Sequence, residues 1–314
     1  MLKNCLTATA IAISFGGTAV AQDYPVKSVT LVTHSSPGAG GDVFLRELAK
    51  ALSPVLGVNV VVENITGGSG ATAMAHIAKA PKDGSILYGT TPTFIYTSLL
   101  SDPEYSYKDL DPVVNVFEDP EMIFTSAKGP FKTLEDAMTK ARESRGTWGA
   151  ANPASLERQS MEMLKTASGV NAAVVTHEGG GDMMINVLNG TLDIGVGEMQ
   201  ELKSQVEAGQ VRILAALTAE RVADYPDIPT VKELGYDVAV RKFRGIAGPK
   251  DLPADVIAAW EAAIPQVLAK PEFKTWYETN SLRPDFMPQS QYRNFINGFA
   301  DQTSDFLRSA GVTQ

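Results

Sequence analysis

The stretch SVTLVT at residues 28–33, followed by HSSPGAGGD at residues 34–42, decides the fold of this chain. The β-branched residues of the first part predict a strand. Leucines then recur at positions 45, 48, 52 and 56, and these spacings of three and four predict a helix opened by Asp42. A strand that passes through glycine into an amphipathic helix begins a βαβ unit. The stretch therefore predicts an α/β fold with largely parallel sheets.

The same order of strand, loop and helix recurs farther along the chain. Thr91-Pro92 and Asn152-Pro153 each combine a capping residue with a proline suited to the first helical position. Further strands are expected at 58–63, 86–88, 147–151, 173–176, 192–196 and 211–217, and helices at 71–80, at 183–188 and up to Gly209. Two such α/β units agree with a length of 314 residues, because a domain averages roughly 150 residues.

Extended stretches at 112–117 and 122–124 lead out of the first unit, and residues 237–243 lead back toward it. The tail from Pro253 is predicted to be helical and, lacking a sheet of its own, to pack on the first unit. The sequence therefore predicts two lobes joined by two crossings, with a cleft between them. The first lobe would comprise residues 22–117 plus 244–314, and the second residues 118–243.

The first 21 residues have the pattern of a signal peptide. Lys3 precedes an apolar run that ends in Ala19-Val20-Ala21, so cleavage is expected after Ala21. The run is shorter than the roughly 18–20 apolar residues that a membrane span needs; the alternative is a buried N-terminal strand or helix. Cleavage leaves 314 − 21 = 293 residues with a net charge of −9 − 1 = −10. It also removes Cys5, the one cysteine of the sequence, so we expect an exported protein without thiols.

Composition excludes several function classes. With 36 acidic against 27 basic residues and no basic run, nucleic acid is not expected as a partner. A single cysteine rules out a disulfide framework, and the three histidines lack metal-ligand spacing. No phosphate-binding Gly-Lys-Ser/Thr and no Gly-x-Ser-x-Gly elbow is present. We therefore predict no catalytic residues, no metal site and no cofactor, and hence not an enzyme.

Five loops join a strand to a helix at 35–42, 66–70, 89–92, 149–155 and 178–182. Helix N-termini present unpaired backbone N–H groups and partial positive charge, so together these loops predict an anion site built mainly from amides and hydroxyls. The alternative is that glycine serves turn geometry alone.

His34 and His177, each at a strand end before a glycine loop, are candidates for ligand contact.

An ordered series of short motifs covers nearly the whole chain after the signal peptide. It comprises YPVK (24–27), LV (31–32), PGxGxD (37–42), VVENxxGG (61–68), KDG (82–84), GxxD (190–193), VRxLA (211–215), PTVxExG (229–235) and RG (244–245). In this series the chain resembles the periplasmic substrate-binding proteins of tripartite tricarboxylate transporters, also called Bug receptors. The resemblance implies a type II-like, two-lobed periplasmic binding protein with two crossing strands.

It also implies a small organic carboxylate as ligand, a two-component membrane permease as partner, a periplasmic location and a monomer. Carried over onto this sequence, the residues expected to bind the ligand are Ser35, Pro37, Gly38, Ala39, Gly40, Gly41, Asp42, Thr90, Thr91, Ala151, Asn152, Ser155, Gly180, Gly181 and Glu198. Within this set we interpret Asp42 as a helix cap. Ser35 stands where many members carry Phe, Gly41 where many carry Thr or Ser, and Glu198 replaces an Asp-Asn pair of some members.

Two other functions remain open at the level of sequence. One is a periplasmic ligand-sensing domain for a signalling system, and the other is a periplasmic hydrolase or lyase, which would need a nucleophile or metal that the sequence does not display. Among ligands, di- and tricarboxylates are preferred over aromatic acids and acidic amino acids.

Overall fold

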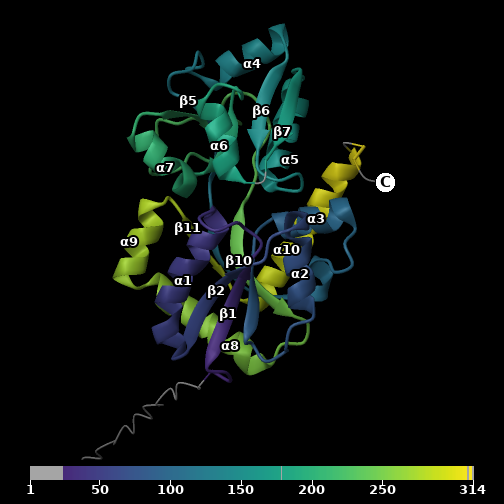
Figure 1. Ribbon diagram of the computed structural model, residues 1–314, viewed down its shortest axis with the longest axis vertical. Coiled ribbons are helices and arrows are strands. Elements are labelled where there is room, and N and C mark those ends of the chain that lie inside the picture. The colour runs from purple at the N-terminus through teal and green to yellow at the C-terminus, as the bar shows by residue number, and fades with distance from the viewer. Residues whose placement is uncertain (1–23, 178, 310, 313–314) are drawn as a thin grey trace, which may run out of the picture.

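The computed structural model describes residues 24–177, 179–309 and 311–312. Over this part the chain forms two α/β lobes, one above the other, linked by strands that run between them (Figure 1). The predicted signal peptide lies outside the described residues. Among the described residues, no helix combines the length and apolar character that crossing a bilayer requires.

The first lobe is built on a six-stranded sheet in the order β11-β4-β10-β3-β1-β2. Strands β1 (Ser28–Thr33), β2 (Asn59–Asn64) and β3 (Ile86–Thr90) are parallel, as the sequence predicts. Strands β4 (Leu110–Glu118) and β10 (Phe243–Pro249) pair antiparallel, because one leaves the lobe and the other returns to it. The prediction of largely parallel sheets is therefore wrong for the strands near the crossings.

The C-terminal tail contributes a strand as well as helices. Residues Arg283–Met287 form β11, which pairs antiparallel with β4 at the edge of the sheet. The tail packs on the first lobe as expected, but the prediction of a wholly helical tail is wrong. The helices of this lobe are α1 (Gly40–Leu56), α2 (Ala71–Ala78), α3 (Thr93–Ser101), α8 (Ala254–Leu268), α9 (Pro271–Thr279) and α10 (Gln289–Ser309), with short 3₁₀ turns η1 (Gly68–Gly70) and η2 (Tyr107–Asp109).

Helices cover both faces of this sheet, and successive residues of β1 point to opposite faces. Leu31 packs with the predicted leucine stripe of α1 and with Trp260 of α8. Its neighbour Val32 packs on the other face with side chains of α2, α3 and α10, including Tyr292. Because β1 is buried on both sides, its C-terminal end is held rigidly where it enters the glycine loop.

The second lobe contains two smaller sheets that a single bridge joins. Strand β5 (Glu121–Ser126) lies between β8 (Gly195–Glu198) and β9 (Val211–Ala216), and β6 (Gly146–Ala150) pairs parallel with β7 (Ala172–Thr176). A bridge between Trp148 and Ile194 connects the two sheets. The helices are α4 (Leu134–Glu143), α5 (Leu156–Ser168), α6 (Gly180–Leu188) and α7 (Met199–Glu207).

Two segments carry the chain between the lobes, and they run side by side. Asp119-Pro120 joins β4 to β5, while the irregular residues 237–242 lead into β10. The lobes also touch away from these crossings, where the Lys203 ammonium on α7 donates to the carbonyl oxygen of Thr279 on α9 at 3.0 Å. The α7 and α9 helices lie next to each other on the left of the molecule (Figure 1).

Several helix starts differ from the sequence predictions. Helix α3 begins at Thr93 after Pro92, and α6 begins at Gly180 and not at residue 183. Helix α1 begins at Gly40 after Ala39, so Asp42 lies in the first turn and is not the N-cap. Helix α5 begins at Leu156, and Ser155 caps it by accepting the backbone N–H of Arg158 at 3.1 Å. The expected start at Asn152-Pro153 is wrong because these residues belong to the turn that precedes this cap.

Candidate ligand-binding site

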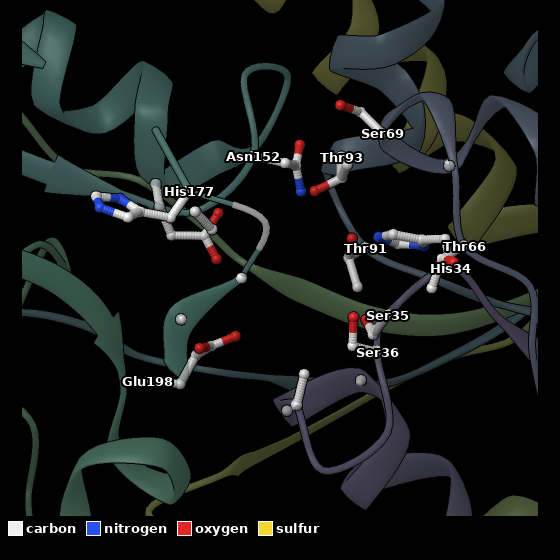
Figure 2. Close-up of a pocket in the computed structure, with 18 of the residues that line it drawn as sticks. His34, Ser35, Ser36, Thr66, Ser69, Thr91, Thr93, Asn152, His177 and Glu198 are labelled. Atoms are coloured by element: carbon white, nitrogen blue, oxygen red, sulfur yellow. The ribbon is translucent and has the colours of Figure 1, made fainter. Parts of the chain in front are cut away.

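A cavity of about 450 Å³ lies where the two lobes face each other. Loops of the first lobe contribute one wall, which includes Ser35, Ser36, Thr66 and Thr91. Asn152, His177 and Glu198 line it from the second lobe (Figure 2). Lys242 and Arg244, next to the crossings, also line the cavity. Its walls therefore come from both lobes and from the segment that joins them.

Within the described part of the chain, six helices begin at this cavity. The lining includes the N-cap or a first-turn residue of each: Gly40 of α1, Gly70 of α2, Thr93 of α3, Glu157 of α5, Gly180 of α6 and Glu198 of α7. Helix N-termini carry partial positive charge and unpaired N–H groups, so their convergence favours an anion. The hydroxyl groups of the lining add neutral donors to these amides.

Asp42 organises the glycine loop from behind the cavity. Its carboxylate accepts the backbone N–H of Gly38 and a side-chain N–H of Asn64, both at 2.9 Å, and pairs with Arg46. Burial opposes ionisation, but the bonds to Arg46 and Gly38 lower the pKa of Asp42 below its usual value. Gly38 itself has a φ of 84°, a region that suits glycine. The carboxylate of Asp42 thus holds the loop in one conformation.

The structure brings most of the predicted residues together. The cavity is lined by Ser35, Ala39, Gly40, Gly41, Thr91, Ala151, Asn152, Gly180 and Glu198. Pro37, Gly38, Asp42, Thr90, Ser155 and Gly181 are not part of this lining. Thr90 points into the core instead, where its hydroxyl bonds to the Tyr292 hydroxyl at 2.6 Å.

Both candidate histidines line the cavity. His34 Nδ1 lies 2.6 Å from the hydroxyl oxygen of Tyr88. Burial, together with the charges of Lys242 and Arg244, lowers the pKa of His34 to about 4, so the ring is neutral at pH 7. His34 therefore presents a hydrogen-bonding ring without charge.

The sequence reasoning missed a buried charge cluster beside the cavity, which we call the hinge cluster. It consists of two cations and five acidic groups from both crossings and the second lobe: Lys242, Arg244, Asp119, Glu121, Glu157, Glu198 and Glu201. One signal could have found its centre, because charged residues at 242 and 244 alternate with Phe243 at the start of an otherwise apolar strand.

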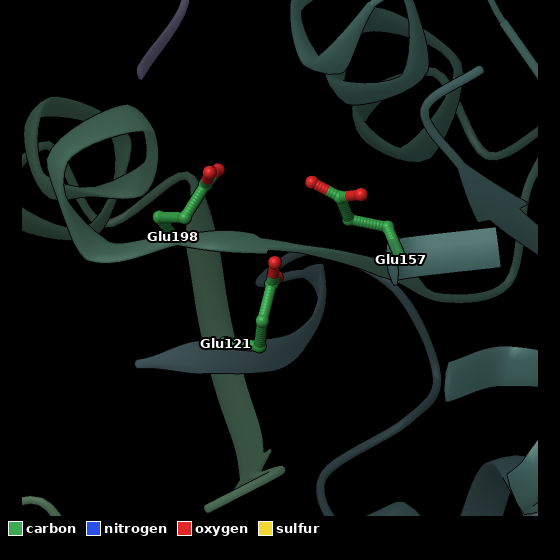
Figure 3. A group of neighbouring side chains, drawn as sticks. All are labelled: Glu121, Glu157 and Glu198. Carbon is green, nitrogen blue, oxygen red and sulfur yellow. The ribbon is translucent and has the colours of Figure 1, made fainter. Parts of the chain in front are cut away.

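Lys242 is the centre of one half of the hinge cluster. Its ammonium lies 2.8 Å from Glu121 and 2.5 Å from Glu157, and it also contacts Glu198. Figure 3 shows these three carboxylates pointing toward one another. Three converging carboxylates could hold a metal ion. Here the lysine ammonium supplies the positive charge, so the arrangement fits an internal ion pair.

Arg244 is the centre of the other half. Its guanidinium bonds to Asp119 at 2.6 Å and to Glu198 at 2.8 Å. Although burial opposes ionisation, Lys242 and Arg244 lower the pKa of Glu198 to about 2. Burial raises the pKa of Asp119 to about 6 against the attraction of Arg244.

A Cβ at Gly40 would come within 2.6 Å of the Arg244 Nη2, so glycine is needed where α1 meets the hinge cluster.

Comparison with known proteins agrees with this architecture. Residues 44–311 match the family described as the tripartite tricarboxylate transporter family receptor. A relative from Agrobacterium vitis, named for the TAR-I ttuE-ttuC' intergenic region, is 30% identical over 81% of this chain and 75% of its own length.

Two solved structures share the fold. The periplasmic binding protein BugD superimposes with a TM-score of 0.84 at 24% identity, covering 92% of this chain and 99% of BugD. R. palustris Rpa4515 with adipate superimposes with a TM-score of 0.87 at 23% identity, again covering 92% and 99% of the two chains. The resemblance inferred from the sequence motifs and the two-lobed fold are both confirmed. The chain belongs to the tripartite tricarboxylate transporter receptor family, whose members are periplasmic solute-binding proteins and not enzymes.

Proposed function

We propose that this protein captures a small di- or tricarboxylate in the cavity between its lobes. The protein would then deliver the ligand to a two-component membrane permease of the same transporter. The observation that carries the proposal is the convergence of six helix N-termini on one cavity that both lobes line. A volume of about 450 Å³ is within the usual range for small-molecule sites.

The related structure that contains adipate, a linear dicarboxylate, supports the same ligand class. Within this proposal the mature protein begins after Ala21 and acts as a periplasmic monomer. Residues 22–117 plus 244–314 and residues 118–243 are the two lobes that enclose the ligand. Of the ligand-binding residues expected from sequence, those that line the cavity would make the direct contacts.

A thermal-shift screen of purified residues 22–314 tests the ligand class. The panel contains succinate, adipate, malate, citrate and tricarballylate, with the fully amidated compounds (diamides or triamides) as neutral controls. A ligand at 100 times its dissociation constant adds about 2.7 kcal/mol to the free energy of unfolding. We expect at least one di- or tricarboxylate to raise Tm and its fully amidated counterpart to have no effect. Stabilisation by the amides but not by the acids would contradict the proposal.

Transport is tested separately, because binding alone does not identify a permease. The gene for this protein is expressed with and without its candidate permease genes in a host that cannot take up the ligand. We expect uptake of radiolabelled ligand only when both parts are present. Ligand binding without uptake in this pair would contradict the transport role and favour a sensing role.

A further inference from the structure

A carboxyl group of the protein itself lies in the part of the cavity where an anion would bind. Glu201 of α7, in the second lobe, accepts the backbone N–H of Gly40 at 3.0 Å. Gly40 is the first residue of α1 in the first lobe, so this bond crosses between the lobes at a helix N-terminus. The free amide that would attract a ligand carboxylate is therefore already engaged.

The second oxygen of Glu201 lies against another helix N-terminus. A Cβ at Gly180, the first residue of α6, would come within 2.5 Å of Glu201 Oε2. The carboxyl group thus lies between the starts of α1 and α6, one from each lobe. It thus occupies a place beside two helix N-termini that an external carboxyl group could otherwise take.

Glu201 is the one acid of the hinge cluster that stands outside its ion pairs. Lys242 and Arg244 pair with Asp119, Glu121, Glu157 and Glu198. Burial and the negative charge of Glu198 raise the pKa of Glu201 to about 8. Glu201 also shares a hydrogen bond with Glu198, so its carboxyl group lies between that acid and the two helix N-termini.

We propose that Glu201 is a specificity-determining residue, an internal carboxyl group that fills one anion position of the cavity. This inference rests on the proposed function. The helix N-termini around the cavity offer several positions for carboxylates. Because the Glu201 carboxyl group takes one of these positions, the receptor accepts ligands that carry one carboxylate fewer. Removing the side chain opens the position, and an external carboxylate then occupies it.

The first test uses acetate and needs no knowledge of the natural ligand. In Glu201→Ala, acetate at about five times its dissociation constant should raise Tm by about 2–4 °C. Acetamide and sodium chloride at the same concentrations should have no such effect. Wild type should respond more weakly at the same acetate concentration, because only its remaining anion positions are open. Glu201→Gln should respond as wild type does, because its amide oxygen still accepts the Gly40 N–H.

Glu207→Ala is the matched control for loss of a carboxyl group from the same helix. Glu207 is exposed at the far end of α7, where it lies 3.8 Å from Lys203. It should behave as wild type with acetate. If Glu201→Ala is too unstable to purify, Glu201→Ser is measured in the same way. Equal responses of wild type and the Glu201 variants to acetate would overturn the inference.

The second test compares two acids that differ by one carboxylate, glutarate and its 3-carboxy derivative tricarballylate. The ratio of their dissociation constants, measured by calorimetry, should shift at least tenfold toward tricarballylate in Glu201→Ala and not in Glu207→Ala. An unchanged ratio in Glu201→Ala would overturn the inference. If wild type binds no carboxylate of the panel while Glu201→Ala still responds to acetate, the proposed function fails and the assignment of Glu201 stands.

Discussion

The backbone N–H of Asp119 donates to the carbonyl oxygen of Lys242 at 2.8 Å, and this bond ties the two crossings together. Immediately beyond it, Phe243 of β10 pairs with Glu118 of β4. The lobes therefore share a narrow, two-stranded connection, and bending there moves one lobe relative to the other without repacking either core.

Ligand binding should close the two lobes and reduce the radius of gyration. Closing around the ligand adds contacts between the lobes while leaving the contacts within each lobe unchanged. Small-angle scattering with and without saturating ligand measures this change. Identical scattering curves, with a compact form in both states, would show that the cavity binds without lobe movement.

Lys242→Met should destabilise the protein strongly. Lys242 is 5% exposed and neutralises Glu121, Glu157 and Glu198, which the variant would leave without that partner. Breaking a buried ion pair by removing one member costs about 3–5 kcal/mol. Lys250→Met is the control, because Lys250 is 47% exposed and its pair with Asp111 should contribute less than about 1 kcal/mol. Urea unfolding compares the two, and equal losses would contradict a stabilising role for the hinge cluster.

Gly40→Ala should weaken ligand binding. The new methyl group would meet Arg244 Nη2 at 2.6 Å and Gln200 Nε2 at 2.7 Å. Arg244 cannot move aside freely because Asp119 and Glu198 hold it. Overpacking of this kind costs about 1–3 kcal/mol of stability. Because Gly40 lines the cavity, displacing these side chains also distorts the ligand site, and a loss of about 1.4 kcal/mol of binding free energy would raise the dissociation constant about tenfold.

Gly298→Ala is the control for that variant. Gly298 lies inside α10, and a Cβ there would have no heavy atom within 4 Å. Alanine should stabilise the helix by up to about 1 kcal/mol and leave the dissociation constant unchanged. Calorimetric titration compares both variants. Equal dissociation constants for Gly40→Ala and Gly298→Ala would contradict the placement of the ligand at the start of α1.

Substitutions at the neighbouring residues Thr90 and Thr91 should have different effects. The first should lower the free energy of unfolding, and the second should weaken ligand binding. Thr90→Val removes a buried hydrogen bond to Tyr292, which should lower the free energy of unfolding by about 1 kcal/mol or more. Thr91→Val removes a hydroxyl group from the cavity wall, which should weaken binding with little loss of stability. Urea unfolding and ligand titration are measured on both variants. Weaker binding by Thr90→Val together with lower stability of Thr91→Val would show that the ligand binds elsewhere.

Glu201 should make stability fall as the pH rises from about 4.5 to about 8. Its pKa is raised from 4.5 to about 8, chiefly by burial and by Glu198, so the folded state keeps a proton that the unfolded chain has lost. The free energy of unfolding then decreases with pH in that window. Glu198, with a pKa of about 2, and Lys242, with a pKa well above 10.5, keep their charges throughout it.

Glu201→Gln does not titrate and should reduce that slope. Urea unfolding between pH 5 and pH 8 compares it with wild type, and Glu207→Gln serves as the control for loss of a carboxyl group. Parallel curves for wild type and Glu201→Gln would show that Glu201 does not hold a proton in the folded state.

The local parts of the fold were predictable from sequence. The run at 28–33 forms β1 with the expected ends, because a β-branched stretch between turn residues permits one interpretation. Strand β11 was missed because RPDFM (283–287) contains proline and charges and shows no alternation. It is a strand only because β4 offers it a partner edge.

The site residues that lie in strand-to-helix loops were predictable from sequence. The ion pairs between residues far apart in the chain were not. Ser35, Gly40, Thr91 and Asn152 line the cavity because each follows a strand that ends there. The hinge cluster unites residues 119, 121, 157, 198, 201, 242 and 244, and no local pattern connects them. Long-range charge pairing of this kind becomes visible only after the chain is folded.

Helix α7 touches the other lobe on two sides, with Glu201 at Gly40 and Lys203 at Thr279. Glu201 and Lys203 are only two positions apart on this short helix, so separation of the lobes breaks both contacts together. Cys5 is the one cysteine of the sequence and precedes the expected cleavage point. Cysteines introduced as Lys203→Cys and Thr279→Cys would thus carry a pair of pyrene labels without background labelling. The receptor would then report its own ligand through pyrene excimer emission, which requires the two labels to touch.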